Sequence, residues 1–263
     1  MFKENYNVIG VMSGTSLDGV DLAYIKFKHS DCWTFEIFQS ETVSYSEEWL
    51  NILKNAIHFS ASELEELNSG YTKLLASIIS DFISKHNLTE IDAVCSHGHT
   101  ILHQPQNGFT LQIGNLPILR ELVPHTIVCD FRVQDVQLGG QGAPLVPIGD
   151  MLLFSDYDYC LNLGGFSNIS FEDKGKRIAF DISPVNTVLN FYSNTLGFEY
   201  DDKGEIAKSG KLDLELFDKL NKLEFYNLSY PKSLGIEFVN EILFPIIESY
   251  KISEKDKLNT FVE

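Results

Sequence analysis

The sequence predicts an α/β protein built from two strand-rich modules. Strand-like and helix-like segments alternate along the 263 residues, which is typical of α/β domains. An apolar strand, a turn rich in Ser, Thr, Gly and Asp, and a returning strand occupy residues 7–27, and a second hairpin pattern lies at 157–182. This repetition, in a chain long enough for one or two domains, predicts modules at residues 1–132 and 133–263.

The first module is predicted to combine a sheet with two helices. Apolar and alternating patterns predict strands at 7–12, 20–27, 34–44, 93–96, 111–113 and 126–131. Helical spacing covers 46–57, and it resumes after a capping pattern at Ser60 and continues to about residue 83. The His-Gly-His sequence at 97–99 is expected to form a turn after a strand.

The second module is predicted to contain a hairpin followed by helices. Residues 157–165 are strand-like, and 167–171 and 177–182 form a hairpin that turns at 173–175. Helix signals cover a segment after Pro144 and residues 184–196, 212–222 and 234–250. Residues 260–263 resemble the beginning of another element.

Composition excludes several classes of protein. A net charge of −17 argues against non-specific binding to nucleic acid or to anionic membranes, since both need a basic surface. The charged N-terminal residues do not resemble a signal peptide, and no segment has the length of apolar sequence that a membrane span needs. We therefore expect a cytoplasmic protein. Its cysteines are widely spaced without a Cys-x-x-Cys pair, and three of the four lie in apolar strand-like runs, so reduced core cysteines are expected; they are Cys32, Cys95, Cys129 and Cys160.

Residues 10–21 (GVMSGTSLDGVD) are suited to holding phosphate. Glycines relax the backbone limits on φ, and hydroxyls next to loop N–H groups favour an anion. An ordinary glycine-containing hairpin turn is the alternative. The predicted phosphate-binding residues are Gly10, Ser13, Gly14, Thr15, Ser16, Asp18 and Gly19. The carboxylates of Asp18 and Asp21 would suit Mg²⁺.

This stretch resembles the anhydro-N-acetylmuramic acid kinase family of the actin, Hsp70 and sugar-kinase superfamily. The resemblance continues at residues 96–100 (SHGHT), 130–132 (DFR), 139–147 (GGQGAPLVP), 162–165 (NLGG) and 180–186 (FDISPVN). It implies an actin-like ATPase (ribonuclease H-like) fold with two domains of mixed sheets flanked by helices. The first domain would carry the phosphate loop, and the second would be incomplete, without the C-terminal third of the family.

The sequence departs from the family pattern at several positions. Ile182 and Ser183 stand where Thr-Gly is usual, His99 where Gln is common, and residues 115–117 (NLP) where Asp-Gly-Ala is common. These differences bear on sugar preference more than on ATP use. They leave open another sugar kinase of the same fold, or a non-catalytic sugar- or nucleotide-binding homologue.

Asp181 is the predicted general base. It ends a strand in front of Pro184, which is expected to open a helix whose N-terminus would favour the ionised carboxylate. A helix N-cap is the structural alternative. The resemblance assigns the base to this aspartate, which would activate water against the anhydro sugar, and it implies ATP and Mg²⁺ as cofactors. Arg132 would stabilise transferring phosphate or grip the sugar, or instead form an ion pair with Asp130 or Asp135.

Other positions are matched to ligands through the resemblance. A second phosphate loop would include Asn162, Gly164 and Gly165, with a β-bulge as its alternative. Substrate contacts would come from His97, Thr100, Gln141, Pro184 and Asn186. The spacing of His97, His99 and His103 also permits zinc, although no cysteine or carboxylate completes such a site.

The function implied is an ATP-dependent kinase that opens 1,6-anhydro-N-acetylmuramic acid and phosphorylates O6 during peptidoglycan recycling. Its partners would be the amino sugar and ATP, without nucleic acid or membrane, and a homodimer is left open. Because the second domain is expected to be incomplete, we expect the 263-residue chain to show no measurable turnover on its own.

Overall fold

The computed structural model describes residues 3–14, 17–104, 107–140 and 142–263. It divides into two compact units, Met1–Leu153 and Phe154–Glu263, each with its own hydrophobic core. Within the described residues, no helix has both the length and the apolar character needed to cross a membrane. The first unit extends past residue 132 because helix α5 (Val146–Leu153) contacts strand β3. The domain boundary after Arg132 stays a prediction.

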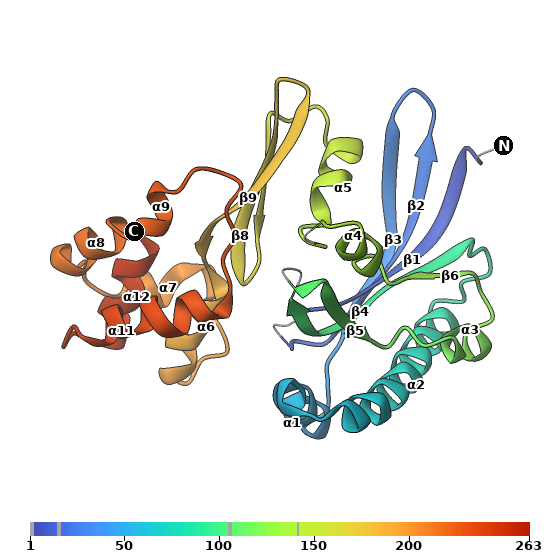
Figure 1. The fold of residues 1–263 in the computed structure, drawn as a ribbon, viewed down its shortest axis with the longest axis horizontal. Coiled ribbons are helices and arrows are strands. Elements are labelled where there is room, and N and C mark those ends of the chain that lie inside the picture. The colour runs from blue at the N-terminus through green and yellow to red at the C-terminus, as the bar shows by residue number, and fades with distance from the viewer. Residues whose placement is uncertain (1–2, 15–16, 105–106, 141) are drawn as a thin grey trace. The chain divides into compact units, whose positions relative to one another are not determined.

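A six-stranded mixed sheet forms the centre of the first unit (Figure 1). Its order is β3-β2-β1-β4-β5, and β6 also pairs with β4. Strand β1 is antiparallel to β2 and parallel to β4, so it lies inside the sheet. The strands are β1 (Asn5–Ser13), β2 (Val20–His29), β3 (Trp33–Val43), β4 (Ala93–Gln104), β5 (Phe109–Ile113) and β6 (Ile127–Cys129).

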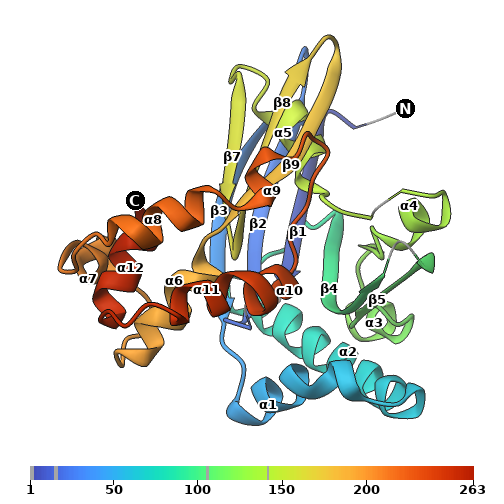
Figure 2. The same cartoon turned by 60° about the vertical axis from the view of Figure 1, so that its left-hand side comes forward.

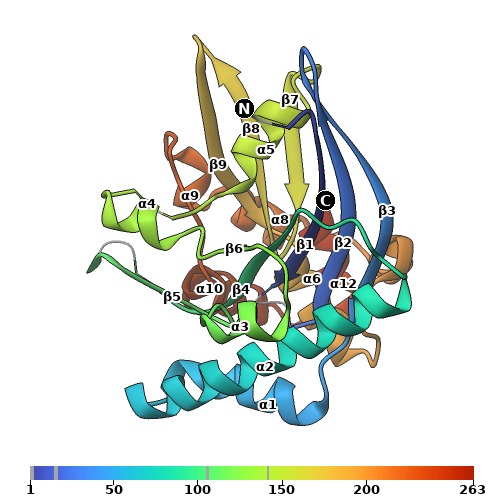
Figure 3. The same ribbon diagram turned by 90° about the vertical axis from the view of Figure 1, so that its right-hand side faces the viewer.

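Helices cover one face of this sheet (Figure 3). They are α1 (Glu47–Asn55), a 3-10 turn (Ala56–His58) and α2 (Ala61–Lys85). Alternate residues of β1 and β2 point to this face because side chains of a strand alternate, and they meet the apolar stripe of α2. The core at this contact contains Ile9, Val11, Val20, Leu22, Tyr71, Leu75, Ile79 and Phe82.

The second unit pairs a three-stranded antiparallel sheet with a group of helices at one end (Figure 2). The strands are β7 (Tyr159–Leu163), β8 (Phe166–Asp173) and β9 (Lys176–Pro184). The helices are α6 (Asn186–Thr195), α7 (Glu205–Lys208), α8 (Leu214–Asn221), α9 (Glu224–Asn227), α10 (Ile236–Phe238), α11 (Phe244–Glu248) and α12 (Glu254–Val262). Their core includes Val188, Tyr192 and Leu216.

The mixed α/β architecture confirms the predicted fold class, and each unit opens with an antiparallel three-strand meander. Three details of the prediction were wrong. Residues 97–99 lie inside β4 rather than in a turn, because pairing with β5 extends β4 to Gln104. The helix expected at 234–250 contains a π-helical turn, Val239–Leu243, before Pro245, which has no N–H for the regular pattern. Residues 260–262 belong to α12, which begins at Glu254, rather than to the start of an element.

Two short helices and the cysteines also differ from expectation. Helices α3 (Ile118–Leu122) and α4 (Val133–Gln137) were not predicted, since five residues are too short for a helical period to show. All four cysteines are free, as expected, but Cys32 is exposed, and Cys95, Cys129 and Cys160 are half-buried rather than in the core. Cys95 lies on the sheet face that α2 does not cover, where it lines a pocket.

The capping box of α2 is expected to contribute to the stability of the first unit. The Ser60 hydroxyl accepts a hydrogen bond from the Glu63 N–H, and the Glu63 carboxylate accepts one from the Ser60 N–H. Ser60→Ala should lower the free energy of unfolding by about 1 kcal/mol, measured by urea unfolding. Ser77→Ala, at an exposed position within the same helix, should leave stability unchanged or raise it. Equal losses for both variants would contradict this assignment.

Candidate functional site

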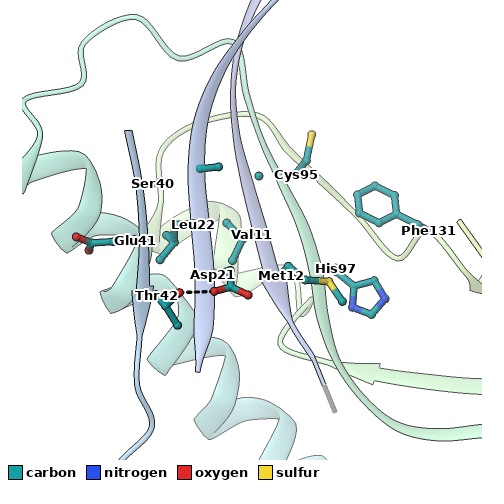
Figure 4. Close-up of a pocket in the computed structure, with 12 residues that line it drawn as sticks. Val11, Met12, Asp21, Leu22, Ser40, Glu41, Thr42, Cys95, His97 and Phe131 are labelled. Atoms are coloured by element: carbon teal, nitrogen blue, oxygen red, sulfur yellow. Dashed lines mark hydrogen bonds between the residues drawn. The ribbon is translucent and has the colours of Figure 1, made fainter. Parts of the chain in front are cut away.

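A pocket of about 450 Å³ opens on the face of the six-stranded sheet opposite α2. The side chains on its floor are small, because Gly10 pairs in register with Ala23 on one side and with Cys95 on the other. Gly10, Asp21 and His97, which were predicted as site residues, all line the pocket. Figure 4 draws Asp21 and His97 among the side chains that line it. The structure therefore brings residues from two separate sequence blocks, 10–21 and 96–100, to one surface of the first unit.

Asp21 is held at the edge of this pocket by the neighbouring strand. The Thr42 hydroxyl donates a hydrogen bond to Asp21 Oδ1 over 2.5 Å (Figure 4), while the side chain remains exposed. Asp18 is exposed as well. The described residues hold no group of three or more His, Cys, Asp or Glu side chains placed to bind one metal ion. Mg²⁺ commonly uses one or two carboxylates with waters and phosphate oxygens, so binding of Mg²⁺ by Asp18 and Asp21 stays a prediction.

The loop between β1 and β2 is fixed at its C-terminal end by Gly19. This residue has a φ of 153°, and a Cβ there would lie 2.4 Å from the Val43 carbonyl oxygen. Only glycine fits such a close approach to backbone. Gly19 is therefore required by the fold of the loop, and ligand binding need not be the reason for it. Thr15 and Ser16 lie outside the described residues.

At the other end of the loop, the Ser13 side chain points into the core. It is 2% exposed, and its Oγ lies 2.6 Å from Tyr45 Oη and 2.9 Å from His99 Nδ1. Burial lowers the pKa of His99 to about 4, because an imidazolium is poorly solvated there. His99 is thus neutral at pH 7, and the Ser13 hydroxyl faces the interior, so only the backbone of this residue is left to face a ligand.

His97 and Arg132 form a hydrogen-bonded pair beside the pocket. Arg132 Nε donates to His97 Nε2 over 2.8 Å, and Arg132 Nη1 donates to the Gly142 carbonyl over 2.6 Å. Since a guanidinium cannot accept, His97 Nε2 is the acceptor, and its proton is on Nδ1, which contacts the Gly98 carbonyl at 2.9 Å. Burial lowers the pKa of both His97 and Arg132. His97 is therefore neutral and fixed in one tautomer.

The alternative ion pair of Arg132 does not form within the described residues. Asp135 instead accepts a hydrogen bond from the Gly142 N–H over 2.6 Å. Arg132 and Asp135 thus bind the carbonyl and the N–H of the same residue, Gly142. Gln141 lies outside the described residues.

The three histidines of the zinc alternative have different partners. A bulge in the pairing of β1 with β4 falls at His97 and Gly98, where Gly98 has a φ of 72°. His97 faces the pocket as Cys95 does, two residues before it, and the irregularity turns His99 toward the core beside Tyr71. His103 Nδ1 lies 3.0 Å from the Thr110 hydroxyl. The nearby Thr100 hydroxyl accepts from Gln112 Nε2 at 3.4 Å.

Asp181 lies within β9 of the second unit and is half-buried. Its Oδ2 accepts a hydrogen bond from the Leu234 N–H over 2.7 Å, and its own N–H donates to the Lys232 carbonyl over 3.0 Å. Burial raises the pKa of this carboxyl, and the Leu234 N–H lowers it in part. The carboxylate is thus oriented by a loop that lies 53 residues away in sequence, which sequence patterns did not reveal.

Pro184 does not open a helix, although the sequence predicted that it would. Pro184 is the last residue of β9, and α6 begins at Asn186. Strand pairing continues past Asp181 because a bulge at Ile182 restores the register of Ser183 with Ser167. Neither the N-terminus of α6 nor an N-cap role therefore accounts for Asp181.

The glycines at 164 and 165 serve the start of α6. The Gly164 carbonyl accepts from the Asn186 N–H at 3.2 Å, and the Gly165 carbonyl accepts from the N–H groups of Val185 and Thr187. A Cβ on Gly165 would lie 2.8 Å from Thr187 Oγ1. The close packing of strand and helix explains this glycine pair, while the side chains of Asn162 and Asn186 are exposed. Ligand binding by these residues stays a prediction.

The buried state of His99 predicts a specific pH dependence of stability. Because the pKa of His99 falls from 6.5 to about 4 on folding, the unfolded chain binds more protons between these values. The free energy of unfolding should therefore fall as pH falls from about 6.5 toward 4, by on the order of 3 kcal/mol.

Urea unfolding can isolate this effect. Both tryptophans, Trp33 and Trp49, belong to the first unit, so their fluorescence reports its unfolding. His99→Gln should flatten the pH dependence relative to the natural chain, since other titrating groups are common to both. Identical pH dependence would contradict the assignment.

Comparisons with known proteins identify the family of this chain. The family model described as anhydro-N-acetylmuramic acid kinase matches residues 6–262. An anhydro-N-acetylmuramic acid kinase from Pseudomonas syringae pv. tomato is 38% identical over 240 residues, covering 88% of this chain and 65% of the relative. Relatives of the same name from Pseudomonas syringae pv. syringae and Hydrogenovibrio crunogenus are 34% and 32% identical, covering 97% and 96% of this chain and 72% and 71% of their own lengths. The chain thus spans about two thirds of the length of these relatives, and over that span it belongs to the anhydro-N-acetylmuramic acid kinase family.

Proposed function

We propose that this protein is an ATP-dependent kinase that hydrolytically opens 1,6-anhydro-N-acetylmuramic acid and phosphorylates its O6. The product is N-acetylmuramic acid 6-phosphate, and the setting is cell-wall recycling in the cytoplasm. Membership of the family and the names of the relatives support this activity. The observation that carries the proposal within this chain is the environment of Asp181, a half-buried carboxylate with a raised pKa and one oxygen held by a backbone N–H.

In the proposed reaction, Asp181 accepts a proton from water while the water oxygen forms a bond to C1 of the sugar. The bond between C1 and the bridging O6 breaks, and its electron pair goes to O6. O6 then attacks the γ-phosphorus of ATP, the bond to the β–γ bridging oxygen breaks, and ADP leaves. Asp181 returns its proton to solvent. A general base works best when it is ionised and its pKa lies near the working pH. Partial burial raises the pKa of Asp181 from the ordinary aspartate value toward that range.

Phosphoryl transfer requires alignment and charge neutralisation. We assign these tasks to the backbone of residues 13–19, to Arg132 and to the second loop at Asn162, Gly164 and Gly165. Asp18 and Asp21 would hold Mg²⁺, which supplies charge neutralisation at the phosphates when bound. Sugar contacts are assigned to His97, Thr100, Gln141, Pro184 and Asn186. A homodimer remains a prediction.

Substitution of the base tests the proposal. In the longest natural form of the protein, Asp181→Asn should lower turnover on the order of 10²-fold or more, the usual scale for loss of a general base. Affinity for the sugar and for Mg-ATP should change by only a few-fold, because the amide is isosteric. Turnover of the natural protein should rise with pH through the raised pKa of Asp181, as the carboxylate forms. Asp158→Asn, at an exposed position of the same unit, is the matched control.

Coupled ADP release with and without the anhydro sugar separates the alternatives. Near-normal turnover of Asp181→Asn would contradict the base assignment. Turnover with a different sugar only would favour a related sugar kinase. Binding of sugar or nucleotide without turnover by the natural protein would favour a non-catalytic homologue, for which the changes at Ile182 and Ser183 are the motivating observation.

A further inference from the structure

Four buried polar side chains meet below the loop that follows β1. They come from the end of β1, the connection between β3 and α1, the middle of α2, and β4, and all belong to the first unit. Their exposed fractions are 2% for Ser13, 9% for Tyr45, 0% for Tyr71 and 3% for His99. We call this group the Ser13 cluster. The mechanism proposed above uses none of the three partners of Ser13.

The hydroxyls of the cluster form a closed ring. Ser13 Oγ lies 2.6 Å from Tyr45 Oη, Tyr45 Oη lies 2.5 Å from Tyr71 Oη, and Tyr71 Oη donates to Ser13 Oγ over 2.8 Å. His99 Nδ1 lies 2.9 Å from the same Ser13 oxygen. The Tyr71 ring also contacts His99, with centroids 5.9 Å apart. Ser13 is thus the one member that lies within hydrogen-bond distance of all three others.

Counting protons determines the direction of these bonds. Four contacts need four protons, but Ser13, Tyr45 and Tyr71 supply one each. The fourth must come from His99 Nδ1. Since Tyr71 donates to Ser13, Ser13 donates to Tyr45 and Tyr45 donates to Tyr71. Every member is then satisfied, and Ser13 Oγ, with one donated and two accepted bonds, has no capacity left for a ligand.

Such a cluster holds the chain in one position. Buried polar groups are costly unless each finds a partner, so a displacement of Ser13 would break three hydrogen bonds at once. Ser13 is the last residue of β1 and directly precedes the predicted phosphate loop. At the other end of that loop, Gly19 lies against the Val43 carbonyl. The two ends are fixed by different means, one by hydrogen bonds and one by close packing.

We propose that Tyr45, Tyr71 and His99 are positioning residues for Gly14, which follows Ser13 and opens the predicted phosphate loop, and that they act through the Ser13 hydroxyl. The ligand class, the phosphates of a nucleotide, rests on the function proposed above. The positioning itself rests only on the cluster. Loss of one member should loosen the loop and weaken Mg-ATP binding, while sugar binding should change much less.

Two substitutions of His99 and one of Tyr71 test this proposal. His99→Leu removes the donor to Ser13, whereas His99→Gln retains an N–H donor on a side chain that reaches a similar distance. We expect His99→Leu and Tyr71→Phe to weaken Mg-ATP binding about tenfold, the effect of losing roughly one well-placed interaction, and His99→Gln to restore most of it. Titration calorimetry with Mg-ATP and, separately, with the anhydro sugar measures both affinities.

Thr72→Val is the matched control. Thr72 follows Tyr71 in α2, is fully buried, and donates to the Asn68 carbonyl over 2.7 Å, so its loss removes a buried hydroxyl without touching Ser13. It should leave Mg-ATP affinity within about twofold. Hydrogen exchange of residues 14–19 gives a second readout that needs no ligand: Tyr71→Phe and His99→Leu should speed exchange there selectively, and Thr72→Val should not.

The outcomes separate the two proposals. Unchanged loop exchange and unchanged Mg-ATP affinity in folded His99→Leu and Tyr71→Phe would overturn the positioning role. Equal effects of Thr72→Val would also overturn it, because general destabilisation would then be the cause. The variants could loosen the loop selectively while the natural protein binds no Mg-ATP. That result would retain the positioning role and overturn both the assigned ligand and the kinase proposal. If His99→Leu does not fold, Tyr71→Phe decides by the same criteria, with Thr72→Val as its control.

Discussion

The packing of α2 against β1 and β2 is the constraint on which the first unit depends. It buries Ile9 and Val11 of β1 and places Tyr71 below the end of that strand. Because β1 is paired on both sides, by β2 and by β4, neither a shift along the strand nor a rotation of it is possible without loss of the core. The strand therefore delivers Ser13 to a fixed point, and the loop that follows starts there.

The same alternation of side chains produces the pocket on the opposite face. Residues of β1 that do not face α2 include Gly10, and the neighbouring strands place Ala23 and Cys95 beside it. A row of small residues in the middle of a sheet leaves space that larger residues would fill. His97 shares this face with Cys95 because the two residues are two apart on β4. The bulge at His97 and Gly98 then changes the alternation, so that His99 is turned to the core.

In the second unit, the carboxylate of Asp181 is positioned by a loop that follows later in the chain. Asp181 is fully inside a strand, and a later loop supplies both a carbonyl for its N–H and an N–H for its Oδ2. That loop is held in turn by Lys232, whose Nζ donates to the carbonyls of Phe225 and Tyr226 and lies 4.6 Å from the Phe225 ring centroid. Partial burial and one backbone donor act in opposite directions on the pKa of Asp181, so its basicity depends on the position of this loop.

The sequence was sufficient to predict the fold class, the strands that begin each unit and the location of α2, because periodicity and caps are local signals. Gly10, Asp21 and His97 were singled out by their motifs and by the family resemblance, and that they line one pocket became clear only from the structure. Bulges at Gly98 and Ile182 could not be predicted, since they depend on pairing with distant strands. The role of Leu234 beside Asp181 and the convergence of Tyr45 and Tyr71 on Ser13 likewise arise from tertiary contacts that leave no local pattern.

Product analysis tests the central claim most directly. The longest natural form of the protein is incubated with Mg-ATP and 1,6-anhydro-N-acetylmuramic acid, and the sugars and nucleotides are quantified by mass spectrometry. The coupled reaction predicts N-acetylmuramic acid 6-phosphate and ADP in equal amounts, with no free N-acetylmuramic acid. Ring opening without phosphorylation, or ADP formed without sugar phosphate, would contradict it.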